Sequence, residues 1–94
     1  MVRVLIERRV LEDKISEYQL AVRGVRVRAM EHDGYISGET LCDAADHRRY
    51  VSISTWSNRG AWEGWAASDA RRELVAKLAP LLVQSERIRV LEPA

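Results

Sequence analysis

The sequence has little of what several classes of protein require. Its only cysteine is Cys42, so no internal disulfide can form, and we expect a reducing, cytoplasmic setting. The chain has 15 basic and 14 acidic residues, and a net charge of +1 gives no field that would attract nucleic acid or an anionic membrane. No apolar run approaches the roughly 20 residues of a membrane span. We therefore expect neither a nucleic-acid nor a membrane partner.

Most motifs that carry catalysis are also missing. The chain has no Gly-rich phosphate loop, no Cys or His cluster with metal-ligand spacing, and no Ser–His–Asp order around a nucleophile elbow. Neither a metal nor a cofactor is expected. No His–Asn pair is placed to activate Cys42, which we interpret as a small residue at a strand end. His32 and His47 are the only imidazoles available for proton transfer near neutral pH, and both are expected in solvated segments.

What the chain does have is the composition of a small globular domain. Hydrophobic residues make up 47% of its 94 residues, which is normal for a folded domain and too high for a disordered one. We expect a single domain over residues 1–94. A chain this short buries roughly 65% of its unfolded surface, so its core is modest and a second copy could cover what one copy leaves bare.

Two periodicities predict the first elements. Residues Val2 to Val10 alternate between apolar and polar side chains, which is typical of a strand. From Lys14 to about Met30 the apolar residues recur every three or four positions, which predicts a helix with one buried stripe. Asp13 is its expected N-cap. The stripe consists of Ile15, Tyr18, Val22, Val25 and Ala29.

A hairpin is predicted after this helix. His32-Asp33-Gly34 is a stop signal for the helix. Strands are expected over Tyr35–Cys42 and Arg48–Trp56, with the polar residues 43–47 as their connector. The same alternation predicts a last strand over Ser85–Leu91.

The segment Thr55–Glu73, TWSNRGAWEGWAASDARRE, carries all three tryptophans close to one strand–helix junction. Large side chains with indole N–H donors, gathered in this way, indicate a pocket wall or a packing hub. Asn58 or Ser57 is expected to cap a short helix, and Ser68 to cap a second helix that ends near Pro80. The surface of the second helix is expected to carry the charged residues Arg71, Arg72 and Glu73.

The order strand, helix, strand, strand, helix, strand predicts an α+β fold of the ferredoxin-like βαββαβ type with an antiparallel sheet. Helices on one face of that sheet leave the other face open. The open face is expected to carry Leu5 with Ser52, Ser54 and Trp56, or else their alternates along the strands. Because a solvent face would be more charged, we expect this face to pack on a second copy in a homodimer. The space between sheet and helices is a candidate small-molecule cavity.

These residues resemble the antibiotic biosynthesis monooxygenase family, whose members are dimeric α/β-barrel proteins. The resemblance covers nearly the whole chain in element order and includes Gly34-Tyr35 at the start of the hairpin. Its most specific part is Trp56 at a strand end, followed by Trp62, Trp65 and the Ser68-Asp69 helix start. The family includes cofactor-free monooxygenases, haem-degrading enzymes, signal-molecule isomerases and members of unknown activity.

The haem-degrading branch is the poorer match. It resembles this chain at Trp65, the tryptophan that presses on the haem. That branch also has a histidine iron ligand about ten residues further on, where this chain has Val75, whose side chain has no lone pair to donate. An asparagine in the first strand of that branch is matched here by Arg8. Haem degradation is therefore not the expected activity.

The cofactor-free branch implies a dry aromatic pocket in which a phenolic or anthrone-like substrate loses a proton and passes an electron to O₂. Trp65 would then stack on the substrate, with Trp62 and Trp56 along the wall, although core packing is the structural alternative for each. The groups that could hold a substrate oxygen are Arg8, Arg89 and Asn58.

Two functions follow as hypotheses. The first is a small cofactor-independent monooxygenase that oxidises an aromatic or quinol-type compound. The alternative is a non-catalytic dimeric module for small-ligand binding or stress response, because the sequence contains no obvious catalytic base.

Overall fold

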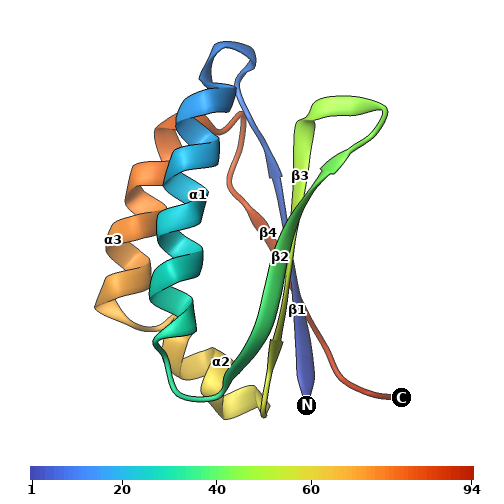
Figure 1. Cartoon of the computed structure of the whole chain (residues 1–94), viewed down its shortest axis with the longest axis vertical. Helices are drawn as coiled ribbons and strands as arrows, with labels where there is room; N and C mark the ends of the chain where they lie inside the picture. The colour runs from blue at the N-terminus through green and yellow to red at the C-terminus, as the bar shows by residue number, and fades with distance from the viewer.

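The computed structural model describes residues 1–94 as one antiparallel sheet with helices on one side (Figure 1). The first half contains β1 (Val2–Arg9), α1 (Ile15–Met30), β2 (Tyr35–Asp43) and β3 (Asp46–Trp56). The second half contains α2 (Arg59–Ala66), α3 (Asp69–Leu78) and β4 (Arg87–Leu91). Short 3-10 turns lie at Glu12–Lys14 and Ala79–Leu81.

The strands lie in the order β2-β3-β1-β4, and every neighbouring pair is antiparallel. Figure 1 shows α1 and α3 on one face of this sheet, with α2 at the end where β3 stops, while the opposite face is bare. The predicted ferredoxin-like fold is therefore confirmed. None of the helices is both long and apolar enough to cross a membrane.

The predicted stripe of α1 faces the sheet. Tyr18, Val22, Val25 and Ala29 are buried and belong to one core cluster of 14 residues between the helices and the sheet. The predicted cap of this helix was wrong. Asp13 lies inside a 3-10 turn that leads into α1, and the position before the helix makes no capping hydrogen bond through its side chain.

The two shorter helices begin at the caps that their sequences predict. The Asn58 side chain accepts a hydrogen bond from the backbone N–H of Ala61 at 2.8 Å, and the hydroxyl of Ser68 accepts one from Arg71 N–H at 3.1 Å. Each bond satisfies one of the N–H groups that a helix start leaves unpaired. Helix α3 ends at Leu78, two residues before Pro80, as predicted.

The hairpin turn is tighter than expected. Strand β3 begins at Asp46, so the connector shrinks to two residues and His47 lies exposed on a strand. Two aspartates hold this turn. Asp43 accepts a hydrogen bond from Ala45 N–H at 2.8 Å, and Asp46 pairs with Arg9 at 2.7 Å. These contacts favour pairing up to the turn, where composition alone indicated a longer polar loop.

The alternation along β3 was predicted correctly, but the β3 residues named first for the open face lie on the other side. In the register of β1 with β3, Val4 is opposite Ser54 and Ile6 is opposite Ser52. Opposite residues of an antiparallel pair share a face. Ser52, Ser54 and Trp56 therefore face the helices with the buried valines of β1.

The alternates along β3 occupy the open face. Leu5 lies on this face as predicted, opposite Ile53, and Val51 is the next β3 residue on the same side. A period of two shows which residues share a face, but it does not show which face is covered. Only the pairing of β3 with β1 decides that.

The turn between α1 and β2 depends on Gly34, whose φ of 86° lies in the left-handed region. Its carbonyl accepts a hydrogen bond from Ser57 N–H at 2.8 Å, which ties this turn to the junction of β3 and α2. A Cβ atom at Gly34 would overlap the side chain of Ala61. The turn is therefore restricted to glycine by both backbone conformation and space.

Gly34→Ala is expected to lower the free energy of unfolding by about 2–4 kcal/mol, because it combines left-handed strain with overpacking. Gly24→Ala is the matched control, since a Cβ there would meet only Leu74, at 4.0 Å, inside α1. That change is expected to raise stability by about 0.5–1 kcal/mol. Urea unfolding followed by circular dichroism measures both, and equal effects of the two changes would contradict the assignment.

Candidate functional site

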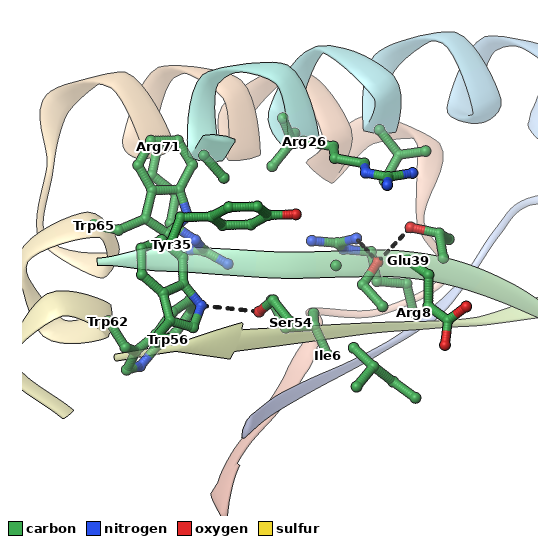
Figure 2. A pocket seen from close by; sticks show the side chains of 17 residues that line it. Ile6, Arg8, Arg26, Tyr35, Glu39, Ser54, Trp56, Trp62, Trp65 and Arg71 are labelled. Carbon is green, nitrogen blue, oxygen red and sulfur yellow. Dashed lines mark hydrogen bonds between the residues drawn. The ribbon is translucent and has the colours of Figure 1, made fainter. Parts of the chain in front are cut away.

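A cavity lies between the sheet and the helices, and the residues that line it come from all but the last of the named strands and helices (Figure 2). Its free volume is about 60 Å³, well below the roughly 150 Å³ of a cavity that admits benzene. Small side chains create the space. Gly38, Ser52 and Ser54 occupy helix-facing positions of β2 and β3 where larger residues would fill it.

The end of the cavity nearest α2 is aromatic. Trp56 comes from the last residue of β3, and Trp62 and Trp65 come from α2. The rings of Trp56 and Trp62 meet edge to face with centroids 5.9 Å apart, and Tyr35 meets Trp56 at 5.4 Å. The indole N–H of Trp56 donates to the hydroxyl of Ser54 at 3.0 Å. These contacts fix the rings as a wall, because edge-to-face pairs favour one relative orientation.

His32 lies against the outside of this aromatic wall. Its ring is 5.8 Å from Trp65 and 6.2 Å from Trp56, and its side chain is half-buried. The imidazole of His32 is therefore partly covered by α2, where it lies near Gly64, and partly solvated, as expected. His32 does not line the cavity. His47 and Cys42 are both exposed on the hairpin, away from the cavity lining.

Beyond the tryptophans, the cavity is bordered by a buried ion-pair network. Arg8 of β1 donates through Nε to Glu86 Oε1 at 2.9 Å, and Arg71 of α3 donates through Nη2 to Glu86 Oε2 at 2.7 Å. Arg8 is 3% exposed and Arg71 is 7% exposed, and both line the cavity. One carboxylate thus joins an arginine of the sheet to an arginine of the helical layer.

The network carries unequal numbers of charges. Burial alone would raise the pKa of Glu86, but the guanidinium groups of Arg8 and Arg71 outweigh it and hold that pKa below its ordinary value. Glu86 therefore stays ionised, and the two cations and one anion leave a net positive charge beside the cavity. The Arg71 guanidinium also lies 5.5 Å from the ring centroid of Trp62.

Further hydrogen bonds orient Arg8. Its Nη1 donates to the Tyr18 hydroxyl and to the Ser52 hydroxyl, each at 3.3 Å, and the latter also bonds to Thr40 at 2.9 Å. Burial raises the pKa of Tyr18, and the nearby Arg8 only partly offsets this. Tyr18 thus remains a neutral core residue that helps to position the guanidinium.

The mouth of the cavity lies between α1 and β2. Tyr35 extends along the cavity there (Figure 2), and a Cβ atom at Gly38 would lie only 2.5 Å from its hydroxyl. Arg26, which is exposed on α1, also borders the space, whereas Glu39 is exposed and lies opposite Ile53 on the open face of the sheet. Glycine at position 38 therefore makes room for the tyrosine side chain in the cavity lining.

The structure brings some of the proposed site residues together and separates others. Trp56, Trp62, Trp65 and Arg8 all line the cavity. Asn58 does not line it and instead caps α2. The other arginine proposed to hold a substrate oxygen, Arg89, pairs with Glu7 at 2.8 Å on the open face of the sheet.

Sequence reasoning missed Arg71 and Glu86. Arg71 was expected at the helix surface, but it is buried because it precedes Leu74 and Leu78 by three and seven positions on the inward side of α3. That spacing could have identified it. Glu86 stands in the segment before β4, and no local signal indicates its two partners. No three His, Cys, Asp or Glu side chains gather in an arrangement that could hold a metal ion.

The family model for antibiotic biosynthesis monooxygenases matches residues 1–77. Among curated protein sequences, none matches the chain at a significant level.

Solved structures similar in fold cover nearly the whole chain. A conserved protein from Methanosarcina mazei Go1 has a TM-score of 0.93 at 16% identity, over 99% of this chain and 92% of its own. An antibiotic biosynthesis monooxygenase has a TM-score of 0.90 at 16% identity, over 100% and 99% of the two chains. SnoaB, a cofactor-independent oxygenase from Streptomyces nogalater, has a TM-score of 0.86 at 13% identity, over 99% and 93%. At these identities the likeness concerns the fold.

The ion-pair network predicts a dependence of stability on acid. The pKa of Glu86 in the folded protein lies below its unfolded value of about 4.3. The contribution of Glu86 to the free energy of unfolding is therefore complete above the unfolded pKa and is lost as pH falls through the folded pKa. Glu86→Gln is expected to cost about 3 kcal/mol near neutrality and to flatten this loss below pH 5.

Unfolding free energies measured by urea titration between about pH 3 and pH 7 check this expectation. The unfolding free energy of Glu86→Gln should fall less steeply than that of the wild type below about pH 5. The exposed Glu73, changed to Gln, is the control and should retain the wild-type slope. An identical slope for Glu86→Gln and the wild type would show that the network does not hold the carboxylate ionised.

Proposed function

Because this chain belongs to the antibiotic biosynthesis monooxygenase family, we propose that it is a cofactor-independent monooxygenase that oxidises a small aromatic compound of the phenol, quinol or anthrone type. The observation that carries the proposal is a single cavity with indole rings at one end and a buried guanidinium network beside it. An aromatic ring can pack on the tryptophans while its oxygen approaches a cationic donor. SnoaB, which has the same fold, is a cofactor-independent oxygenase.

The proposed reaction needs few functional groups from the protein. The bound compound loses a proton, its anion passes one electron to O₂, and the two radicals combine at a ring carbon to form a peroxide. When the carbon is a methylene, loss of water from the peroxide leaves a carbonyl, so one oxygen atom enters the product and the other leaves as water. The cavity walls exclude bulk water, and Arg8 donates hydrogen bonds to the oxygen that carries the negative charge.

Binding requires the cavity to widen. Its volume of about 60 Å³ is too small for an aromatic ring, given that benzene occupies a cavity of roughly 150 Å³. We infer that Tyr35 swings away from Gly38 to admit the compound, because its side chain lines the cavity and its hydroxyl lies against Gly38. A rotation of this kind changes only side-chain torsions and leaves the sheet in place.

We propose in addition that the chain acts as a homodimer. Its open sheet face combines apolar side chains with charges of both signs, such as the Glu7–Arg89 pair, and a two-fold axis can match such a face with itself. The apolar residues of this face are Leu5, Leu41, Val51, Ile53 and Leu91.

The alternative remains a non-catalytic module that holds a small ligand. It is favoured by the absence of a histidine from the cavity lining, where the only acidic residue, Glu39, is exposed and lies opposite Ile53 on the open face of the sheet. The two functions differ in one measurable respect, because only the monooxygenase consumes oxygen when an oxidisable phenol is bound.

Purified protein is expected to raise the rate of oxygen uptake above the buffer rate with hydroquinones or anthrones. Trp65→Phe is expected to lower kcat/KM by about three- to tenfold, because it removes part of the indole wall worth about 0.5–1.5 kcal/mol. Tyr50→Phe is the control, since Tyr50 is a buried aromatic residue outside the cavity lining.

An oxygen electrode and product analysis measure this activity. Uptake equal to the buffer rate for every phenol tested, together with tight binding of the same compounds, would replace the monooxygenase by the non-catalytic alternative.

Val51→Glu is expected to weaken self-association by about 100-fold or more, because two buried charges would face the interface without partners. Val27→Glu is the matched control, since Val27 is 55% exposed on α1 in the helical layer. Light scattering coupled to size-exclusion chromatography gives the mass of each protein. A wild-type monomer at micromolar concentration, or a dimer that both changes disrupt equally, would contradict the proposed interface.

A further inference from the structure

The network beside the cavity has one more positive charge than negative charge. Arg8 and Arg71 are buried and share a single carboxylate, that of Glu86, whose side chain is 11% exposed. The other two charged residues of the cavity lining do not alter this balance, because Arg26 is exposed and screened by solvent, and Glu39 is exposed and lies opposite Ile53 on the open face of the sheet. The cavity is therefore the one place between the layers where a buried positive charge lacks a counter-charge.

Arg71 also lacks a hydrogen-bond partner at one buried atom. Its Nε is shielded from solvent and donates to no acceptor, although the Nη2 of the same group reaches Glu86. Buried donors without a partner are rare in folded proteins, and each calls for an explanation such as a missing ligand. Because Arg71 lines the cavity, an acceptor atom bound there can supply the missing hydrogen bond.

We propose that the cavity binds its aromatic ligand as an oxyanion, with Arg71 and Arg8 as the receiving groups, and that no side chain of the protein acts as the base that ionises it. This inference rests on the function proposed above for the same cavity, and it names the ionisation state of the compound and a residue that sequence reasoning missed. The O–H bond of the phenol breaks, its proton passes to solvent water through the mouth, and the electron pair stays on the oxygen.

The other groups around the cavity agree with this assignment. Glu86 cannot accept the proton readily, because both of its oxygens are held by guanidinium groups. Tyr18 and Ser52 are hydroxyls that accept hydrogen bonds from Arg8, and they carry no charge. A net positive charge in a site of low dielectric favours the charged form of a bound phenol, just as a neighbouring arginine lowers the pKa of a carboxyl group.

A charge series tests the proposal by equilibrium binding. Glu86→Gln raises the net charge of the network by one, and Arg71→Gln lowers it by one. The probe is 4-nitrophenol, whose phenol and phenolate forms absorb at different wavelengths, so a pH titration of the bound probe gives its pKa directly. Arg72→Gln is the control, because Arg72 is the exposed neighbour of Arg71 on α3 and its loss changes the total charge of the protein equally.

The wild type is expected to bind the phenolate about tenfold more tightly than the phenol, which lowers the pKa of the bound probe by about one unit. Arg71→Gln should remove most of this preference, Glu86→Gln should increase it, and Arg72→Gln should leave it unchanged. If the network had a purely structural role, Arg71→Gln and Glu86→Gln would change the preference for the phenolate in the same direction. That result, or a bound probe whose pKa is not lowered in the wild type, overturns the proposal.

A second measurement covers the case in which Glu86→Gln does not fold. Benzoate and benzamide differ in charge but hardly in shape, and quenching of the fluorescence of Trp56, Trp62 and Trp65 reports their binding. Arg71→Gln is expected to raise the Kd for benzoate by about tenfold and the Kd for benzamide by less than about twofold. Equal weakening of both compounds would overturn the proposal.

These measurements are independent of turnover. A lowered pKa of the bound probe without any oxygen uptake would contradict the proposed monooxygenase activity and support the anion site. Oxygen uptake by a protein that binds benzamide as tightly as benzoate would support the activity and contradict the anion site.

Discussion

The carboxylate of Glu86 is the contact on which the cavity depends. It binds Arg8 of the sheet and Arg71 of the helical layer, so it joins the two layers where apolar side chains do not fill the space between them. Burying ions is costly unless each one is paired, because desolvation is large compared with the attraction gained. The network therefore requires all three members, and its uneven charge is a direct consequence of having one carboxylate for two arginines.

The cavity itself follows from side-chain size on one face of the sheet. On β1 the helix-facing positions carry Val4 and Ile6, which are buried in the core, whereas the residues opposite them on β3 are Ser54 and Ser52. Protein interiors pack closely, so a small residue leaves a space only when its neighbours cannot move to fill it. Here the rigid group of indole rings and the ion-pair network hold the walls apart.

About half of the candidate site could be predicted from the sequence. The three tryptophans stand close together along the chain, and their size and clustering are local signals. Arg8 was one of three oxygen-holding candidates, and the sequence offered no way to choose among them. Glu86 reaches Arg8 across 78 positions of sequence, so only the folded chain could reveal that pair.

The sequence by itself determined the order of the elements, the buried stripe of α1 and the caps at Asn58 and Ser68, because each depends on residues within a few positions of one another. The tertiary structure alone decided which face of β3 turns inward and therefore that Ser52 and Trp56 border a cavity. It also decided that Arg71 is buried, because that depends on which side of α3 meets the sheet. Such choices arise from strand register and layer packing, which join residues that are distant along the chain.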